Sequence, residues 1–444
     1  MTPAALIATA TFIGVIVVIM TEQLHLTIAA LLGALILVLC HVLTLKEGID
    51  YISQSHATLA LFLGVMILVR SFEPTKVFEY LATKMVLIAK GSGKLLLVGI
   101  VAITTPICAV LPNATTVMLL APLIPPIAEE IGIDCVPLLI LMVFVANSSG
   151  LLTIVGDPAT FLVGDAINMT FIDYLRQLSL GGVIAVISIL VLLPFLFSPI
   201  WKTKFEHLEN LPHPQINHPR VLLLGGLIVA FVLIFFAIGE SLPVPISPDV
   251  VALLGATLAL LLAHRSKIDT VHNILRDVDW STLIFFMAIF VLIGGLQKTG
   301  VVNNLSDLLT LVLGTNIALG SVVLVFVIGI LSSVIPNIPL VTAMIPLLKQ
   351  YIVSAGMASP EILNPDFSGQ FPPEVLPLFF AMMFGATLGG NGTLVGASSN
   401  IVAAGIAEQH GKQISFATFL KYGLPVMSVQ LVVTAIYITF AFLL

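Results

Sequence analysis

The stretch LPNATTVMLLAPL, residues Leu111–Leu123, decides the fold of this chain, because it returns as IPNIPLVTAMIPL at Ile335–Leu347. Aligning the two stretches places the Pro-Asn pair at Pro112 on the Pro-Asn pair at Pro336. Both pairs interrupt apolar runs, and hydrocarbon offers no partner for the backbone groups that such a break frees. The repeat therefore predicts two helix breaks that are buried in protein or line a wet cavity.

Other segments extend this repeat in both directions. The same alignment places TLALF at Thr58 on TLIFF at Thr282, and a slightly longer offset places GLLTIVGD at Gly150–Asp157 on GNGTLVGA at Gly390–Ala397. The additional length lies in a polar segment that begins at Ser354. Ordered matches with length changes in loops indicate an internal duplication, which in secondary transporters usually relates two inverted repeats.

The composition excludes a soluble protein. Of 444 residues, 59% are hydrophobic and 9% are charged, and the mean hydropathy is +1.15, whereas soluble domains carry about 25% charged residues. Crossing a bilayer takes roughly 20 apolar residues as helix, and such runs recur along the chain. We therefore predict an all-α polytopic membrane protein with two inverted repeats, about ten full spans and two re-entrant hairpins.

Several classes of function are disfavoured by what the sequence lacks. There is no basic tract, so nucleic acid is not an expected partner. The three cysteines show no CxxC spacing, and the histidines lie in loops or at the ends of apolar runs, which argues against a disulfide framework, a metal centre or a covalent cofactor. The segment Met1–Met20 contains no Lys or Arg and is predicted to form a span and not a signal peptide.

The repeat also predicts the domain organisation. The first inverted repeat is expected over residues 1–200, a cytoplasmic linker over 201–219 and the second repeat over 220–444. Each repeat would hold a re-entrant hairpin and a broken helix. The hairpins are expected near 94–128 and 316–354, and the broken helices near 136–168 and 374–408.

The positive charges predict an orientation. With the Pro-Asn segments at hairpin tips, most of the Lys and Arg residues share one side of the membrane. The positive-inside rule makes that side cytoplasmic, which places both termini outside a cell (inner or plasma) membrane. Thr75–Lys90 and Val301–Leu313 are expected to lie along the membrane surface, as amphipathic helices or as surface loops.

The Pro-Asn breaks supply the first candidate binding residues. A helix that restarts after proline presents free N–H groups and the positive end of its dipole, which suits an anion. Asn and Thr side-chain oxygens suit Na⁺ instead, and an ordinary loop with Asn as a helix cap is the alternative. The candidates are Asn113, Ala114, Thr115 and Asn337.

A second pair of polar breaks covers Asn147–Pro158 and Gly389–Asn400. Glycines there allow unusual backbone angles and bring carbonyls and amides close to a bound ion. Close helix packing through small residues is the alternative, but it does not account for the polar side chains beside the glycines. The candidates are Ser149, Gly150, Thr153, Gly156, Asn391, Thr393, Ser398, Ser399 and Asn400.

Asp157 is the strongest single candidate. Placing a carboxylate inside an apolar region costs free energy, so such a residue marks a functional site by default. Its repeat counterpart is Ala397. It could exchange a proton or bind Na⁺ directly, and it could also cap the half-helix that begins at Pro158. A Na⁺ site is therefore predicted at Asn113, Asp157, Asn337 and Asn400.

The same residues resemble a known family. LGGNGTLVGASSNIVAAGIAEQHG at Leu388–Gly411, followed by ISFATFLKYGLPVM at Ile414–Met427, is similar to the second-repeat signature of the ion transporter superfamily. The branch in question holds arsenite efflux permeases, NhaD-type Na⁺/H⁺ antiporters and the melanosomal P protein. TIVGDPATFLVGDAINMTFIDYL at Thr153–Leu175 looks like the first-repeat signature GDPPN, with Ala159 and Thr160 in place of its last two residues.

This resemblance implies a scaffold domain and a transport domain in each protomer of a homodimer, surrounded by membrane lipid. It implies that hairpin-tip motifs bind Na⁺ and substrate, with Asn113, Ala114 and Thr115 matching the first motif, while Ile338 and Pro339 depart from the second. Arsenite permeases sometimes work with an ATPase. This chain has no nucleotide-binding motif, so ATP would have to act through another subunit.

Two functions remain open. The first is a secondary active transporter of a small anion, an arsenite-like oxyanion or a carboxylate, coupled to H⁺ or Na⁺ by alternating access, with an elevator-type movement expected. The second is a Na⁺/H⁺ antiporter that uses Asp157 with Asn113, Thr153 and Asn400. An intramembrane enzyme is disfavoured, because no HExxH motif and no second intramembrane aspartate accompany Asp157.

Overall fold

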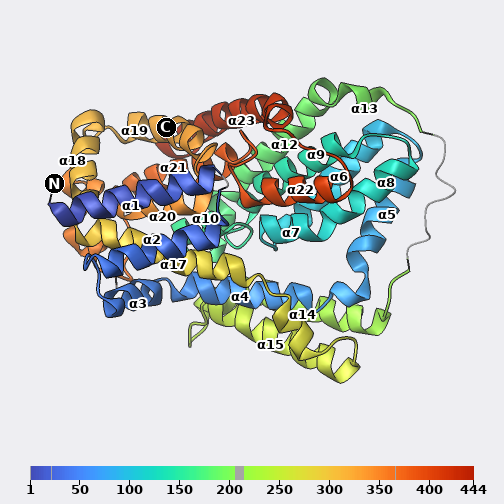
Figure 1. Ribbon diagram of the computed structural model, residues 1–444, viewed down its shortest axis with the longest axis horizontal. Helices are drawn as coiled ribbons and strands as arrows, with labels where there is room; N and C mark the ends of the chain where they lie inside the picture. The colour runs from blue at the N-terminus through green and yellow to red at the C-terminus, as the bar shows by residue number, and fades with distance from the viewer. Residues whose placement is uncertain (1, 22, 206–214, 366) are drawn as a thin grey trace.

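The protein is built of helices throughout its described part. The computed structural model describes residues 2–21, 23–205, 215–365 and 367–444 (Figure 1). These residues form no β-strand, and only an isolated bridge joins Ser92 to Lys204. The predicted all-α polytopic fold is confirmed. The linker predicted over 201–219 includes residues 206–214, which lie outside the described residues.

The helices of the first half alternate long spans with short segments. They are α1 (Pro3–Met20), α2 (Leu26–Leu39), α3 (Leu45–Gln54), α4 (His56–Arg70), α5 (Val77–Ala89), α6 (Gly93–Cys108), α7 (Asn113–Leu120), α8 (Ile124–Glu130), α9 (Cys135–Ser149), α10 (Pro158–Ala166), α11 (Phe171–Gln177), α12 (Ser179–Leu196) and α13 (Ser198–Lys202).

The helices of the second half follow in a similar order. They are α14 (Pro219–Ile238), α15 (Pro248–Ser266), α16 (Val271–Arg276), α17 (Trp280–Lys298), α18 (Val301–Leu313), α19 (Ile317–Ser332), α20 (Asn337–Ser354), α21 (Leu376–Gly389), α22 (Ser398–Gln409) and α23 (Phe416–Ile438). Under the sequence repeat, α4 corresponds to α17, α9 to α21 and α10 to α22.

Eight of the described helices are long and apolar enough to cross a membrane. They are α1, α4, α9, α12, α14, α15, α17 and α23, some with a flanking turn. Two shorter apolar segments, α2 and Pro373–Gly389, complete the set of about ten spans that the sequence predicts. The second of these is short because its helix breaks at Gly389.

The two predicted Pro-Asn breaks share one geometry. Pro112 precedes α7 with φ −52° and ψ 138°, and Pro336 precedes α20 with φ −51° and ψ 140°. Proline fixes its own φ and cannot donate to the preceding turn, so α6 and α19 end upstream of it. The next helix then begins at the asparagine in both halves, at Asn113 and Asn337.

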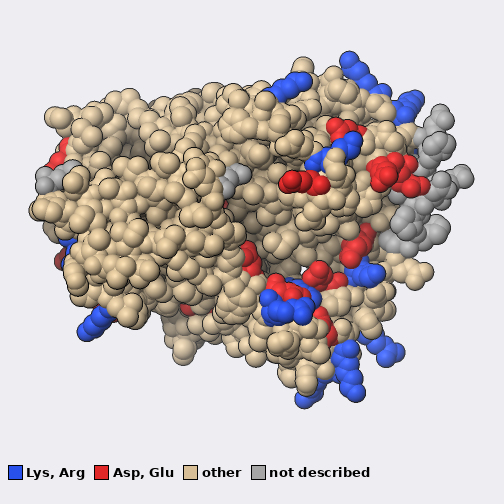
Figure 2. Space-filling view, viewed as in Figure 1, with Lys and Arg blue, Asp and Glu red and all other residues tan. Residues whose placement is uncertain are grey.

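Corresponding segments of the two halves lie at opposite ends of the molecule. Figure 1 shows α5 at the right end and α18 at the left end, each running across the direction of most other helices. The chain turns by 118° between α18 and α19. In Figure 2 most of the visible Lys and Arg residues lie toward the end that holds α5. This is the arrangement that inversion of the repeats requires.

The corresponding helices α9 and α21 form the interior. Both are apolar on all sides, and nearly every residue in each is buried. A helix that is hydrophobic all round belongs in the core of a large protein. Because α9 and α21 each end in a polar break, they place those breaks deep inside the protein.

Ion pairs fasten the ends of α4 and α17. Arg70 Nη2, in the last turn of α4, lies 2.7 Å from Asp277 Oδ2 and 3.1 Å from Asp269 Oδ2. At the far end of α17, Lys298 Nζ lies 2.6 Å from Glu47 Oε1. The hydrogen bond from Lys298 lowers the pKa of Glu47 to about 2. Helix α3 is thereby tied to α17, and α4 to the segment before α17.

Candidate functional site

Both hairpin tips reach the same carboxylate. Asn113 Nδ2 donates to Asp157 Oδ1 at 3.0 Å, and Asn337 Nδ2 donates to the same oxygen at 3.5 Å. The two asparagines are each 5% exposed and Asp157 is fully buried. The structure therefore brings together three residues that the sequence predicts to meet from separate breaks.

Asp157 also caps α10. Its Oδ2 accepts from the backbone N–H groups of Ala159 at 3.1 Å and Thr160 at 3.3 Å, and from Thr387 Oγ1 at 3.5 Å. The capping role named as the alternative is therefore present, and it is compatible with ion binding. No salt bridge among the described residues includes Asp157. Neutral donors surround the carboxylate, which leaves its charge for a cation or a proton.

Asn147 joins the two halves of the site. Its Oδ1 accepts from Asn113 Nδ2 at 3.1 Å and from Ser399 Oγ at 2.6 Å. Its Nδ2 donates to Asn391 Oδ1 at 3.0 Å and to Asn400 Oδ1 at 3.1 Å. One amide side chain at the end of α9 therefore links the first hairpin tip to the broken helix of the second half.

The network continues into two spans that were not expected to contribute to the site. Asn391 Nδ2 donates to Gln430 Oε1 at 2.8 Å, and Gln430 Nε2 donates to Ser148 Oγ at 2.8 Å and to the Ala185 carbonyl at 3.1 Å. Gln430 is fully buried in α23. An amide side chain within the apolar run of α23 was the signal that could have identified it.

Two threonines anchor the broken helices to the hairpins. Thr153 Oγ1 donates to the carbonyl of Ala109, and Thr393 Oγ1 donates to the carbonyl of Ser333. Each bond joins the unwound segment after α9 or α21 to the end of the helix that leads to a tip. The two bonds are equivalent under the repeat, so the same connection is made in both halves.

Glycine is required where these segments cross. A Cβ atom on Gly156 would lie 2.7 Å from the carbonyl oxygen of Cys108 and 2.8 Å from that of Gly150. A Cβ atom on Gly396 would lie 2.8 Å from the carbonyl oxygen of Gly390. Only a residue without a side chain permits this approach, which keeps the backbone of the breaks close to Asp157.

Other candidates lie at the edge of the network. Ser149 Oγ donates to Thr105 Oγ1 at 3.3 Å, away from Asp157. Asn113 Oδ1 accepts from the N–H of Ala114 at 2.8 Å, and Thr115 is half-buried in the same turn. Ser398 is exposed and lines a cavity of about 360 Å³, together with Asn337. Sequence adjacency to the breaks did not distinguish these residues from those that face the carboxylate.

Removing either threonine hydroxyl should loosen the site. Thr393→Val leaves the buried Ser333 carbonyl without its donor, which costs about 1–3 kcal/mol, and Thr153→Val does the same to the half-buried Ala109 carbonyl at a cost toward the lower end. We expect both variants to unfold at lower temperature in detergent and to transport more slowly. Thr257→Val is the matched control, because the Thr257 hydroxyl bonds to its own helix on an exposed face. Equal stability of all three variants would contradict this role.

The arrangement can hold an ion without a dedicated metal centre. Helices α7, α10, α20 and α22 all begin at these breaks, so their positive ends point toward the same region. Within the described ranges there is no cluster of three or more His, Cys, Asp or Glu residues that could hold a metal. The available ligands are amide and hydroxyl oxygens and one carboxylate.

Comparison with known proteins shows the family to which this chain belongs. A protein family described as citrate transporter matches residues 16–364. The chain is 74% identical to a protein named uncharacterized transporter from Synechocystis sp., over 98% of this chain and 97% of that protein. It is 28% identical to the human P protein, over 98% of this chain and 60% of that protein. The predicted resemblance to the P protein branch is confirmed.

A solved structure shares the fold. The YdaH transporter of Alcanivorax borkumensis, described as having an unusual topology, superposes with a TM-score of 0.58 at 14% identity, covering 89% of this chain and 86% of that one. Together these relatives show a multi-pass membrane transporter and not an enzyme. Since the family match spans well over half of its residues, this chain belongs to the citrate transporter family.

Proposed function

We propose that this chain is a secondary active transporter of a small anion, an arsenite-like oxyanion or a carboxylate, coupled to H⁺ or Na⁺. Asp157 would bind the coupling cation with Asn113 and Asn337, and the N-termini of the surrounding half-helices would attract the anion. Movement of the hairpins and broken helices against the scaffold would give alternating access of the elevator type.

One observation carries this proposal. Three helix starts from two sequence-related halves, those of α7, α10 and α20, contact one buried carboxylate that lacks a basic partner among the described residues, and the start of α22 bonds to Asn147 beside them. A buried carboxylate without compensation is unstable, so it takes up a cation or a proton. A bound cation then neutralises the site and lets an anion approach the helix N-termini. Binding of the anion therefore depends on prior binding of the cation, which couples the transport of the two.

The second candidate is a Na⁺/H⁺ antiporter. This candidate is favoured by the composition of the hydrogen-bond network around Asn147. Among the described residues of that network, Asp157 is the only one with an ionisable side chain. A single carboxylate can exchange Na⁺ for H⁺ without any anion. Asn113, Thr153 and Asn400 would then hold the site in place around it.

The setting of the protein forms part of the proposal. We place the end that carries α5 in the cytoplasm, because most Lys and Arg residues belong to that side, and both termini outside a cell membrane. We also propose a homodimer in lipid. An ATPase subunit would join it only if the substrate is arsenite-like.

Flux measurements in proteoliposomes test the proposal. We expect uptake or efflux of citrate, phosphate or arsenite that depends on a Na⁺ or H⁺ gradient and vanishes in empty liposomes. Cation-dependent proton flux with no anion present would favour the antiporter. Absence of both activities from correctly folded protein would reject the proposal.

A further inference from the structure

A second cavity lies on the other side of the second hairpin tip. It has a volume of about 410 Å³ and is lined by α3, α4, α10, α17, α18 and α20. Thr342 of α20 lines this cavity, whereas Asn337 and Ile338, one turn earlier in the same helix, line the 360 Å³ cavity. We name the larger one the Thr58 cavity and the smaller one the Thr282 cavity, after a lining residue of each.

The two cavities occupy opposite ends of α17. Thr282, at the start of that helix, lines one cavity, and Gln297, near its end, lines the other. These residues are separated by about 22 Å along the helix axis, at a rise of about 1.5 Å per residue. The Thr282 cavity is also lined by Met20 at the end of α1 and His25 before α2, and the Thr58 cavity by the junction of α3 and α4.

The repeat relates the linings of the two cavities. Thr58 and Thr282 are equivalent under the alignment that joins Pro112 to Pro336, and so are Phe62 and Phe286, one turn farther along each helix. The Thr58 hydroxyl is buried and has no hydrogen-bond partner among the described residues, although it faces a cavity. A buried polar group in that position is normally paired, so it indicates water in the cavity.

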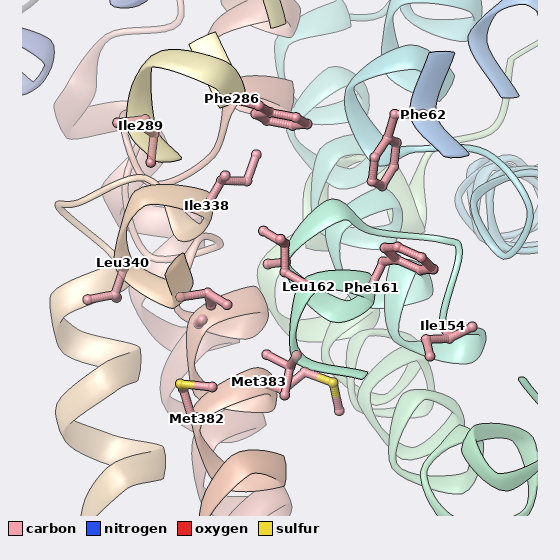
Figure 3. Packing of buried hydrophobic residues seen from close by; sticks show 14 of the residues in the cluster. Phe62, Ile154, Phe161, Leu162, Phe286, Ile289, Ile338, Leu340, Met382 and Met383 are labelled. Carbon is pink, nitrogen blue, oxygen red and sulfur yellow. The ribbon is translucent and has the colours of Figure 1, made fainter. Parts of the chain in front are cut away.

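Phe62 and Phe286 contact each other, and on α17 Phe286 lines the Thr282 cavity while Phe290, one turn farther along, lines the Thr58 cavity. The ring centroids of Phe62 and Phe286 are 6.0 Å apart in an edge-to-face arrangement, and both side chains are fully buried. Phe161 of α10 packs against Phe62 with centroids 6.3 Å apart. Figure 3 shows these rings with Leu162 and Ile338, which extend the apolar layer toward α10 and the second tip.

We propose that Phe62 and Phe286 form a fixed hydrophobic barrier between two access cavities, one from each side of the membrane. The inference rests on the proposed function, because in the proposed elevator-type movement the hairpins and broken helices carry the solute past this barrier. Phe62 and Phe286 belong to α4 and α17, whose ends are tied by the Arg70 and Lys298 ion pairs. Phe161, which packs against Phe62 of α4, belongs to α10, one of the broken-helix segments. An apolar constriction blocks hydrated ions by excluding water.

Cysteine labelling tests the two access routes without needing transport activity. Ser55→Cys and Thr282→Cys would be made after replacing all three native cysteines with serine or alanine. A charged, membrane-impermeant methanethiosulfonate should label the two positions from opposite sides of the membrane. Each should react at least about tenfold faster from its own side, since the barrier excludes hydrated reagent. Phe195, on the span α12, is 74% exposed and lines neither cavity, so we expect it to face lipid and Phe195→Cys not to react.

Labelling of both positions from one side, or of neither, would overturn the two-cavity arrangement. A transporter with another substrate would still give opposite-side labelling, so this outcome separates the inference from the proposed function.

A leak measurement tests the barrier itself. The double variant Phe62→Ala with Phe286→Ala should raise passive proton leak in proteoliposomes by about tenfold, because water enters the constriction. Phe236→Ala removes an equally buried ring from α14 and is the control. A leak no greater than in the Phe236 variant would reject the barrier. If the double variant misfolds, the single Phe286→Leu variant, which keeps an apolar side chain, should keep the wild-type leak while Phe286→Ser raises it.

Discussion

Replacing Asp157 with asparagine is expected to abolish ion coupling while leaving the protein folded. Asparagine caps a helix as well as aspartate does, so the bonds to Ala159 and Thr160 can be kept. The charge that would hold a cation is lost. Losing one partner of a buried charge pair costs about 3–5 kcal/mol, so cation affinity should fall by about two to three and a half orders of magnitude.

The measurement is ion-dependent flux in proteoliposomes, together with size-exclusion chromatography to establish folding. Asp134→Asn is the matched control, because Asp134 caps α9 by the same kind of bond and lies outside the network. We expect the control to transport like the wild type. Unchanged Na⁺ and H⁺ dependence in the Asp157 variant would remove this residue from the mechanism.

Replacing Asn147 with alanine is expected to destabilise the protein and weaken the site at the same time. The change removes the hydrogen bonds that Asn147 makes with Asn391, Asn400 and Ser399. Each buried polar group left unpaired costs about 1–3 kcal/mol, so the loss should be about 3 kcal/mol or more in total. Thermal unfolding in detergent measures the first effect, and apparent ion affinity measures the second.

A second variant separates hydrogen bonding from packing. Asn147→Leu keeps the branching and the number of side-chain heavy atoms but cannot pair with these amides, so it should be destabilised as strongly as the alanine variant. Asn304→Ala, on the exposed face of α18, should unfold like the wild type. Recovery of full stability in the leucine variant would mean that Asn147 only fills space.

The positions of the helix breaks could be predicted from the sequence because they leave a strong local signal. Proline and glycine inside apolar runs are costly in lipid, and their return at corresponding positions of both halves is not expected by chance. This is why Asn113, Asp157 and Asn337, which flank the breaks, were identified and lie together. The placement of α5 and α18 at opposite ends of the molecule follows from the same repeat.

Residues within unbroken helix were harder to find. Asn147 and Thr387 occupy equivalent positions before the two unwound segments, and both contact the network. Asn147 begins the predicted break but was not among the candidate residues, and Thr387 lies outside the predicted break. Which face of α9 or α21 points toward Asp157 is set by tertiary packing. The hydrophobic pattern does not show this face, because both helices are apolar all round. For the same reason the sequence did not separate Ser399, which faces Asn147, from Ser398, which does not.

The pairing of Asp157 in one half with Ala397 in the other has an electrical consequence. Near-symmetric halves would contribute equal charges, but here one contributes a carboxylate and the other a methyl group. In the proposed cycle, the empty and deprotonated moving part would therefore carry one net negative charge at this point. A membrane potential of 100 mV acts on one such charge with about 2.3 kcal/mol. A membrane potential that is negative inside would then drive the unloaded, negatively charged moving part outward. The outward-facing state would therefore be the more populated state of the empty transporter.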